Sequence, residues 1–435
     1  MNLKNTFLRS TLLLTFAGIL SRLLGFYYRI FLANTIGAEG IGIYQLIFPI
    51  YGLCFALCAS GIETSVSKLT AEKYALGKQE EALGILKTAI TITLTLALSC
   101  SLVLFQYAEP IAYFFLKESR CTTLLRLLAL TIPLGTVQSC ICGYYFGIHQ
   151  ATIPSFAQLV EQGFRIGFTI LLYNIYKVNS LPISSILAVA GLVIGEFCSL
   201  LFTLTCFSFQ KKIQWHLHTS HFFTYLREIY SLAAPLTISR ISITFLAGFE
   251  ATLIPTALRN YGMDSSLALS IYGILNGMAL PFILFPNALT ISLSIMLLPK
   301  ISEFQISGQK DKLNTTIKKT FSYCLFLGIF SLLFFLIFGD FLGNLVFSNA
   351  LAGNFITILA WLCPFLYLNT TLNGILNGLG RADLTFFNGV FSQILRIIFV
   401  IFLIPEIGIK GYLLGLLTSQ LFVTLSSTFA LRSFF

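Results

Sequence analysis

Long apolar stretches, each about as long as a membrane is thick, dominate this sequence. A helix of about 20 apolar residues spans the hydrocarbon core of a bilayer. We count twelve such stretches and expect membrane-spanning helices over residues 9–33, 41–64, 83–107, 122–147, 153–174, 183–208, 229–257, 267–298, 320–346, 352–376, 384–404 and 411–433. The connections between them are short. They leave no room for a catalytic domain outside the membrane, so no enzymatic activity is expected.

Composition supports a membrane protein. Only 10% of the 435 residues are charged and 56% are hydrophobic, whereas soluble domains carry about 25% charged residues. A cytosolic enzyme, a disordered chain and a secreted disulfide scaffold are therefore excluded. The net charge of +10 comes from lysines in short loops and not from a basic stripe, so no nucleic-acid partner is expected. A phosphate-binding G-x-x-x-x-G-K-[ST] motif is absent, and no cofactor is expected.

Cysteine and histidine patterns give little support for a metal site. The ten cysteines lie mostly inside apolar runs and are interpreted as small hydrophobic residues. His216, His218 and His221 follow Trp215 in one loop with a spacing that could bind a metal. No acid or cysteine completes the set, and Trp and His are common at a membrane interface. No metal is therefore expected.

Positive charges predict the orientation of the helices. Lysine and arginine gather in the connections that follow even-numbered helices and at the adjoining start of the third helix: Lys68, Lys73, Lys78, Lys87, Lys211, Lys212, Arg227, Lys300, Lys310, Lys312, Lys318 and Lys319. Cytoplasmic loops carry an excess of these residues. The pattern predicts a multi-pass protein of the cell membrane with both termini in the cytoplasm.

The sequence also contains an internal repeat. At an offset of 231 or 232 residues it pairs Pro49 with Pro281, Lys68 with Lys300, Pro133 with Pro364, Gly143 with Gly374, Gly147 with Gly378, Gln162 with Gln393 and Arg165 with Arg396. Each half holds six helices, and an even number gives both halves the same orientation. We therefore expect an all-α membrane protein with two parallel six-helix lobes, residues 1–210 and 229–435, joined by a cytoplasmic loop at 211–228. Two such lobes enclose a central cavity that can operate by alternating access.

Charged residues inside the predicted helices are the candidate site residues. Five arginines lie there: Arg22, Arg29, Arg165, Arg240 and Arg396. An arginine at the centre of a membrane helix costs about 2.5–3.5 kcal/mol even on a lenient scale, so these side chains should face protein or water. The guanidinium group binds phosphate oxygens through two parallel hydrogen bonds. The arginines therefore predict an anionic substrate in the cavity.

Acidic residues leave a second interpretation open for some of these arginines. Glu161 and Arg165 are four residues apart and could pair on one helix. Glu196 and Glu250 could pair with arginines on neighbouring helices, or could couple transport to a cation or a proton. Arg22, Arg29 and Arg240 have no acid three or four residues away, and we expect them to bind the substrate.

Three sequence segments resemble a known family. Residues 21–26 (SRLLGF), 36–42 (IGAEGIG) and 61–69 (GIETSVSKL) resemble the polysaccharide transporters of the multidrug/oligosaccharidyl-lipid/polysaccharide (MOP) exporter superfamily, which includes sporulation proteins. The resemblance implies a MATE-like fold and flipping of a polyprenyl-diphosphate-linked sugar between leaflets, with membrane lipids as the surroundings. It also implies that helices 1, 2, 7 and 8 line the cavity, which brings forward Arg22, Arg29, Arg240 and Glu250.

Other functions of this fold stay open. Lipid II flippases share a similar opening motif, but they generally have fourteen spans, whereas twelve are counted here. Twelve spans are common in other oligosaccharide flippases and in drug exporters. A cation-coupled multidrug exporter is the main alternative, and it is disfavoured because central arginines outnumber central acids. A membrane-embedded glycosyltransferase would need catalytic residues on an outer loop, and the outer loops are too short. The sequence does not give the oligomeric state.

Overall fold

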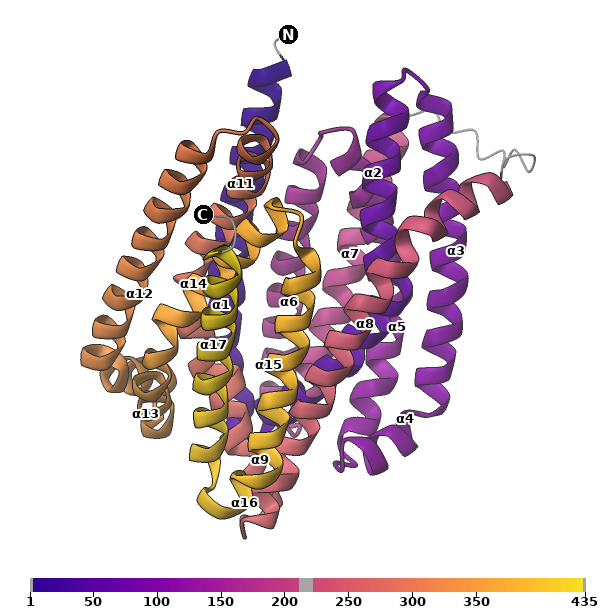
Figure 1. Ribbon diagram of the computed structural model, residues 1–435. Coiled ribbons are helices and arrows are strands. Elements are labelled where there is room, and N and C mark those ends of the chain that lie inside the picture. Colours follow the sequence, from indigo (N-terminus) through magenta and orange to yellow (C-terminus); the bar gives the residue numbers. More distant parts are fainter. Residues whose placement is uncertain (1–2, 211–221, 433–435) are drawn as a thin grey trace. The chain divides into compact units, whose positions relative to one another are not determined.

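The structure is a computed structural model that describes residues 3–210 and 222–432, and the regular elements in this part of the chain are helices (Figure 1). They are α1 (Leu3–Phe55), η1 (Ala56–Ser60), α2 (Gly61–Ala75), α3 (Gln79–Gln106), α4 (Ala108–Pro110), η2 (Ile111–Phe115), α5 (Cys121–Gly147), α6 (Thr152–Val178), α7 (Ile186–Gln210) and α8 (Phe222–Asn260). The later elements are α9 (Ser265–Gly273), η4 (Ile274–Ala279), α10 (Leu280–Leu284), α11 (Asn287–Ile306), α12 (Lys310–Phe347), α13 (Ala350–Leu359), η5 (Ala360–Leu362), α14 (Cys363–Gly378), α15 (Ala382–Phe402), α16 (Ile404–Ile407) and α17 (Ile409–Arg432). The predicted all-α fold is confirmed.

The long element α1 consists of two helices joined at Gly37. The backbone of Gly37 has φ 72° and ψ 179°, a conformation that a residue with a side chain rarely adopts. The break falls in the connection predicted between the first two membrane helices. α1 therefore contributes the first span and the beginning of the second, which continues through η1 into α2.

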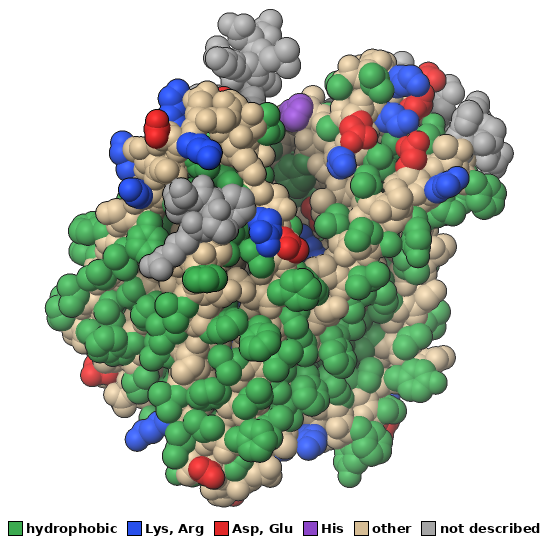
Figure 2. All heavy atoms as spheres, in the orientation of Figure 1, with side chains coloured by type: hydrophobic (Ala, Val, Ile, Leu, Met, Phe, Trp, Pro, Cys, Tyr) green, Lys and Arg blue, Asp and Glu red, His purple; other side chains and the backbone are tan. Residues whose placement is uncertain are grey.

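Eleven helical stretches in the described residues are long and apolar enough to cross a membrane, close to the twelve predicted. The first stretch, Phe16–Ala75, holds both of the first two predicted spans. α6, which covers the predicted span 153–174, is not among these eleven stretches. The predicted span 267–298 is divided between α10 and α11, where Pro286 cannot donate a helical hydrogen bond. The chain is a multi-pass membrane protein, and Figure 2 shows hydrophobic side chains over the middle of the visible face with charged ones toward the helix ends.

The chain forms two compact units. Unit 1 contains residues 1–28 and 46–248, and unit 2 contains residues 29–45 and 249–435. Both α1 and α8 contribute to each unit. The lobe limits expected from the sequence, 1–210 and 229–435, stay a prediction.

Close helix packing within unit 2 explains why residues 29–45 belong to it. A Cβ atom on Gly42 would lie 2.1 Å from the carbonyl oxygen of Leu269, and one on Gly273 would lie 2.2 Å from that of Ala38. Only glycine allows backbones to approach so closely. Ser266 adds a 2.6 Å hydrogen bond from its hydroxyl to Glu39. This segment of α1 is therefore fixed to α9.

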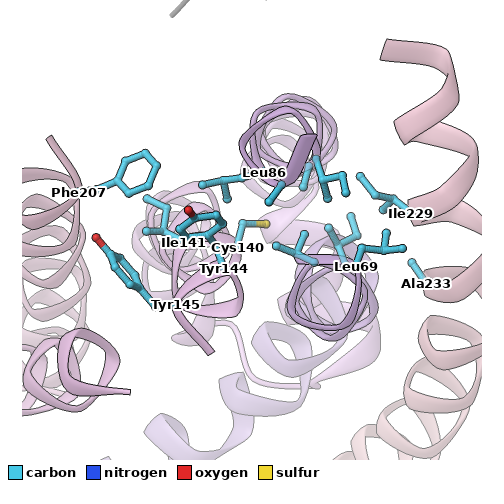
Figure 3. Packing of buried hydrophobic residues seen from close by; sticks show 14 of the residues in the cluster. Leu69, Leu86, Cys140, Ile141, Tyr144, Tyr145, Phe207, Ile229 and Ala233 are labelled. Carbon is cyan, nitrogen blue, oxygen red and sulfur yellow. The ribbon is translucent and has the colours of Figure 1, made fainter. Parts of the chain in front are cut away.

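The core of unit 1 is a cluster of apolar side chains from α2, α3, α5, α6, α7 and α8 (Figure 3). Tyr144 is fully buried, and its ring meets the ring of Phe207 edge to face at 5.9 Å. Ile229 and Ala233 bring the first half of α8 against Leu69 of α2. This packing holds together the helices that carry the polar residues described below.

The internal repeat is visible in the helix packing of each unit. In unit 1, a Cβ atom on Gly143 would lie 2.7 Å from the carbonyl oxygen of Glu63. In unit 2, a Cβ atom on Gly374 would lie 2.9 Å from the carbonyl oxygen of Ser294. Both residues of the second contact follow those of the first at the predicted offset of 231. One helical turn later the same pair of contacts occurs again: Gly147 packs against the carbonyl oxygen of Ser67, and Gly378 packs against that of Leu298.

Candidate functional site

Unit 1 contains a polar cavity between its helices. Its volume is about 310 Å³, and it is lined by Tyr51, Phe55, Glu63, Gly135, Gln138, Ser139, Cys142, Phe146, Pro154, Gln158, Glu161 and Glu196. These residues come from α1, α2, α5, α6 and α7. Three of them are glutamates: Glu63 and Glu196 lie in stretches long and apolar enough to cross a membrane, and Glu161 lies on α6. A buried carboxylate is costly unless it is paired, hydrogen-bonded or protonated, so the partners of each one decide what the cavity can do.

Glu196 of α7 is the most deeply buried of the three, with 8% of its surface exposed. The hydroxyl of Tyr51 donates a 3.2 Å hydrogen bond to Oε1. Oε2 accepts no hydrogen bond from the described residues and lies over Gly135. A Cβ atom on Gly135 would come within 3.0 Å of Oε2. The glycine therefore makes room for the carboxylate on the face of α5.

Glu63 of α2 faces α5 one helical turn after the point at which Glu196 faces it. The hydroxyl of Ser139 donates a 2.6 Å hydrogen bond to its Oε2. Because Gly135 and Ser139 are four residues apart, they lie on one face of α5 about 5.4 Å apart along the axis. Glu196 and Glu63 thus face successive turns of the same helix.

The third glutamate, Glu161, forms an ion pair with Arg165 on α6. This is the pairing expected from their spacing. Gln138 of α5 donates a 2.6 Å hydrogen bond to Ser199, while its Oε1 has no partner in the described part of the chain. Arg165 therefore neutralises Glu161, and no arginine forms a comparable pair with Glu196 in the described residues.

Unit 2 holds a smaller polar cluster around Glu250, which is 4% exposed. Arg396 of α15 lies 3.5 Å from Oε2 of Glu250, and Gln393 donates a 2.8 Å hydrogen bond to the same oxygen. The expected pairing of Glu250 with an arginine on a neighbouring helix is confirmed. One acid and one arginine leave this cluster electrically balanced.

Unit 2 has no acid at the positions that correspond to the three cavity glutamates of unit 1. At the offset of 231, Ser294 corresponds to Glu63 and Ser392 to Glu161. In α17, Gln420 follows Gly415 at the same interval at which Glu196 follows Gly191 in α7, and both glycines pack closely against the preceding long helix. Neutral side chains therefore stand in unit 2 where unit 1 has carboxylates.

The other three candidate arginines form no ion pair with an acid in the part of the chain that the structure describes. Arg22, near the middle of the first helix of α1, and Arg240, near the middle of α8, are exposed on unit 1. Within the described residues neither forms an ion pair or a hydrogen bond, although Arg240 is close enough to Glu63 to act on its charge. Arg29 is half-buried in unit 2 and interacts electrostatically with Tyr44.

The structure brings together some predicted residues and leaves others in separate units. Arg22, Arg165 and Arg240 belong to unit 1, and Arg29 and Arg396 to unit 2, so their convergence on one cavity stays a prediction. The motif His216, His218 and His221 lies outside the described residues. Sequence reasoning missed Tyr51, Gln138 and Ser139, because their hydrogen-bond partners are distant in the chain. A comparison of the two halves of the sequence could have identified the glutamates of unit 1 that have neutral counterparts in unit 2.

The chain matches two protein families and is similar to a protein of Bacillus subtilis. A family described as polysaccharide biosynthesis protein matches residues 7–305, and a second family, MatE, matches residues 260–402. Stage V sporulation protein B of Bacillus subtilis (strain 168) is 29% identical over 433 residues, covering 97% of this chain and 83% of that protein.

Two solved structures show the same fold. The lipid II flippase MurJ in an inward closed conformation has a TM-score of 0.73 and 16% identity, covering 97% of this chain and 87% of the other. A multidrug resistance MATE family transporter of the MOP superfamily, in an inward-facing conformation, has a TM-score of 0.70 and 16% identity, with 95% of each chain covered. The expected MATE-like fold is confirmed.

Proposed function

Because the chain belongs to the polysaccharide biosynthesis protein family, we propose that it is a flippase. It moves a lipid-linked, polyprenyl-diphosphate oligosaccharide or related cell-envelope precursor across the cytoplasmic membrane. The proposal makes the chain a transporter and not an enzyme, and it places both termini in the cytoplasm. The similarity to stage V sporulation protein B supports a role in building the cell or spore envelope.

The observation that carries the proposal is the unpaired charge of Arg22 and Arg240. Both lie near the middle of long apolar helices, both are exposed on unit 1, and neither pairs with an acid in the described residues. Such a position costs about 2.5–3.5 kcal/mol for each arginine, which a diphosphate ligand would offset. Forked guanidinium contacts suit phosphate oxygens. Arg29, on unit 2, is the third candidate of this kind.

Arg165 and Arg396 have a different status. Each pairs with a glutamate of its own unit, which favours a structural role over direct binding of the diphosphate. Their contribution to the substrate site is therefore indirect: they hold Glu161 and Glu250 in place. Transport itself would proceed by alternating access, which the inward-facing state of a transporter with this fold supports.

Two alternatives have specific observations behind them. The MatE match and the similarity to a MATE family transporter favour a cation-coupled multidrug exporter. The similarity to MurJ favours lipid II as the substrate. Exposed arginines repel cationic drugs but suit any diphosphate, so the first alternative fits the charges less well than the second.

A leaflet-resolved transport assay separates these functions. The protein is reconstituted in vesicles with a fluorescent polyprenyl-diphosphate oligosaccharide, with fluorescent lipid II, or with a cationic dye. The proposal predicts protein-dependent loss of leaflet asymmetry for the first substrate. Movement of lipid II alone would narrow the function to the second alternative, and accumulation of the dye alone would show a drug exporter.

A further inference from the structure

Three cysteines of unit 1 meet where the second membrane-spanning segment packs against α3. Cys54 lies near the end of α1, Cys58 lies in the π-helical turn η1, and Cys100 lies on α3. All three are free cysteines. Sγ of Cys100 is within hydrogen-bond reach of both other thiols. The sequence interpretation as separate small hydrophobic residues misses this cluster, because Cys100 is distant from the other two in the chain.

Helix packing explains why the three thiols share one interface. Cys54 and Cys58 are four residues apart and therefore lie on the same side of their segment. On α3, the fully buried Thr93 and Ala97 mark the side that packs into unit 1, and Cys100 continues that side three residues later. The turn η1 packs directly against α3. π-helical turns are rare and often lie at functional sites.

Thiols this close to one another can bind a soft metal ion or form a disulfide. In the described part of the chain, no three His, Cys, Asp or Glu side chains form a group that could hold a metal ion. A disulfide needs only two sulfur atoms within reach, and Cys100 has two such neighbours. We propose that Cys54, Cys58 and Cys100 form an oxidation site of unit 1, at which Cys100 makes a disulfide with either of the other two.

The surroundings of Cys100 indicate the class of oxidant. Cys100 is half-buried within the apolar, membrane-spanning stretch Gln79–Gln106. Leu96 and Val103, which adjoin it on the surface of the helix, are exposed. A lipid-soluble quinone can therefore approach from the hydrocarbon region, where a charged oxidant is strongly disfavoured. Two S–H bonds break and one S–S bond forms, and the two hydrogen atoms reduce the quinone to its quinol.

Unit 2 supplies a matched substitution. At the repeat offset of 231, Ser331 of α12 corresponds to Cys100. Ser331 is 4% exposed, so serine is accepted at this place in the fold. Cys100→Ser is therefore expected to fold and to lack the disulfide. Cys198 is half-buried in the membrane-spanning helix α7, and Cys198→Ser serves as the control.

The test counts free thiols before and after oxidation. Full-length protein in lipid vesicles is reduced, freed of reductant and treated with decylubiquinone, a fully substituted quinone that does not add to thiols. It is then unfolded and alkylated with N-ethylmaleimide. Intact mass spectrometry should find all ten cysteines alkylated before oxidation and two fewer afterwards, and a reductant should restore them. Peptide mapping should show Cys100 linked to Cys54 or Cys58, and the charged oxidant ferricyanide should form no link.

Variants identify the central thiol. Cys100→Ser and the double variant Cys54→Ser/Cys58→Ser should lose no thiol on oxidation, because each removes every neighbouring pair. Cys54→Ser alone, Cys58→Ser alone and the control Cys198→Ser should each still lose two.

Four results would contradict the proposal. An unchanged thiol count in the treated wild type would show that the thiols are inert, and a link between two copies of the chain would move the bond outside unit 1. A link that persists in Cys100→Ser would exclude Cys100 as the central thiol. Oxidation by ferricyanide but not by decylubiquinone would exclude a lipid-soluble oxidant. The experiment needs no lipid-linked substrate, so its outcome is independent of the flippase proposal.

Discussion

The hydroxyl of Thr93 and the thiol of Cys140 lie 3.2 Å apart in the buried core of unit 1. Thr93 is on α3 and Cys140 is on α5. In unit 2 the same contact occurs between Cys324 and Thr371, at 3.3 Å, with the threonine and the cysteine exchanged. Both residues follow their counterparts at the repeat offset of 231. The two units therefore share the position of a buried polar contact while differing in which helix supplies the thiol.

This exchange predicts that unit 1 tolerates the arrangement of unit 2. The double variant Thr93→Cys/Cys140→Thr should retain the melting temperature of the wild type in detergent. Thr93→Val should lower stability by about 0.5–1.5 kcal/mol, because it removes one partner of the hydrogen bond. A double variant less stable than Thr93→Val would show that the two units do not accept the same contact.

The glycine contact that binds residues 29–45 to α9 predicts a loss of stability on substitution. In Gly42→Ala the new Cβ atom would lie 2.1 Å from the carbonyl oxygen of Leu269, and overpacking of this kind costs about 1–3 kcal/mol. Gly25→Ala in the same element meets nothing within 4 Å and serves as the control. Thermal unfolding followed by size-exclusion fluorescence measures both. Equal stability of the two variants would contradict the close packing.

The ion pair in unit 2 predicts a second-site rescue. Arg396→Leu leaves Glu250 buried without its positive partner, and breaking a buried pair costs about 3–5 kcal/mol. The amount of folded protein should fall sharply. Adding Glu250→Gln should restore most of it, because the amide carries no charge and Gln393 remains in hydrogen-bond range. Failure of the second substitution to raise the folded fraction would assign Arg396 a role beyond neutralising Glu250.

The proposed orientation predicts which loops are accessible from outside the cell. The described protein contains buried or half-buried cysteines only, so a single cysteine at Lys78 or at Lys310 reports on its loop. Both should resist membrane-impermeant maleimide in intact cells and react after permeabilisation. A cysteine at Lys117 should react in intact cells. Labelling of either lysine-rich loop from outside would show that the orientation is opposite to the proposed one.

Much of the fold was predictable because its determinants are local or periodic. The lengths of the apolar stretches predicted the helices, and the break at Gly37 lies between the predicted spans 9–33 and 41–64. The internal repeat needed only paired prolines, glycines and arginines at one offset. The division of span 267–298 lies at Pro286, between α10 and α11, and it was missed because the residues on both sides of that proline are apolar.

The candidate site was predictable only in part, because its partners are far apart in the chain. The pairing of Glu161 with Arg165 follows from helical spacing, but Tyr51 meets Glu196 across 145 residues. No periodicity connects them. Likewise, the exposure of Arg22 and Arg240 depends on which helix faces are covered, which tertiary packing decides.

Transport by the double variant Arg22→Ala/Arg240→Ala is the most direct test of the proposed function. Both arginines are exposed and unpaired on unit 1, so the variant should fold normally. It should flip the polyprenyl-diphosphate oligosaccharide at least tenfold more slowly, since each lost diphosphate contact costs about 1.5–3 kcal/mol. Lysine at both positions should rescue only partly because it lacks the forked geometry. The exposed Arg126→Ala is the control and should flip at the wild-type rate. Wild-type flipping by a well-expressed double alanine variant would contradict the account.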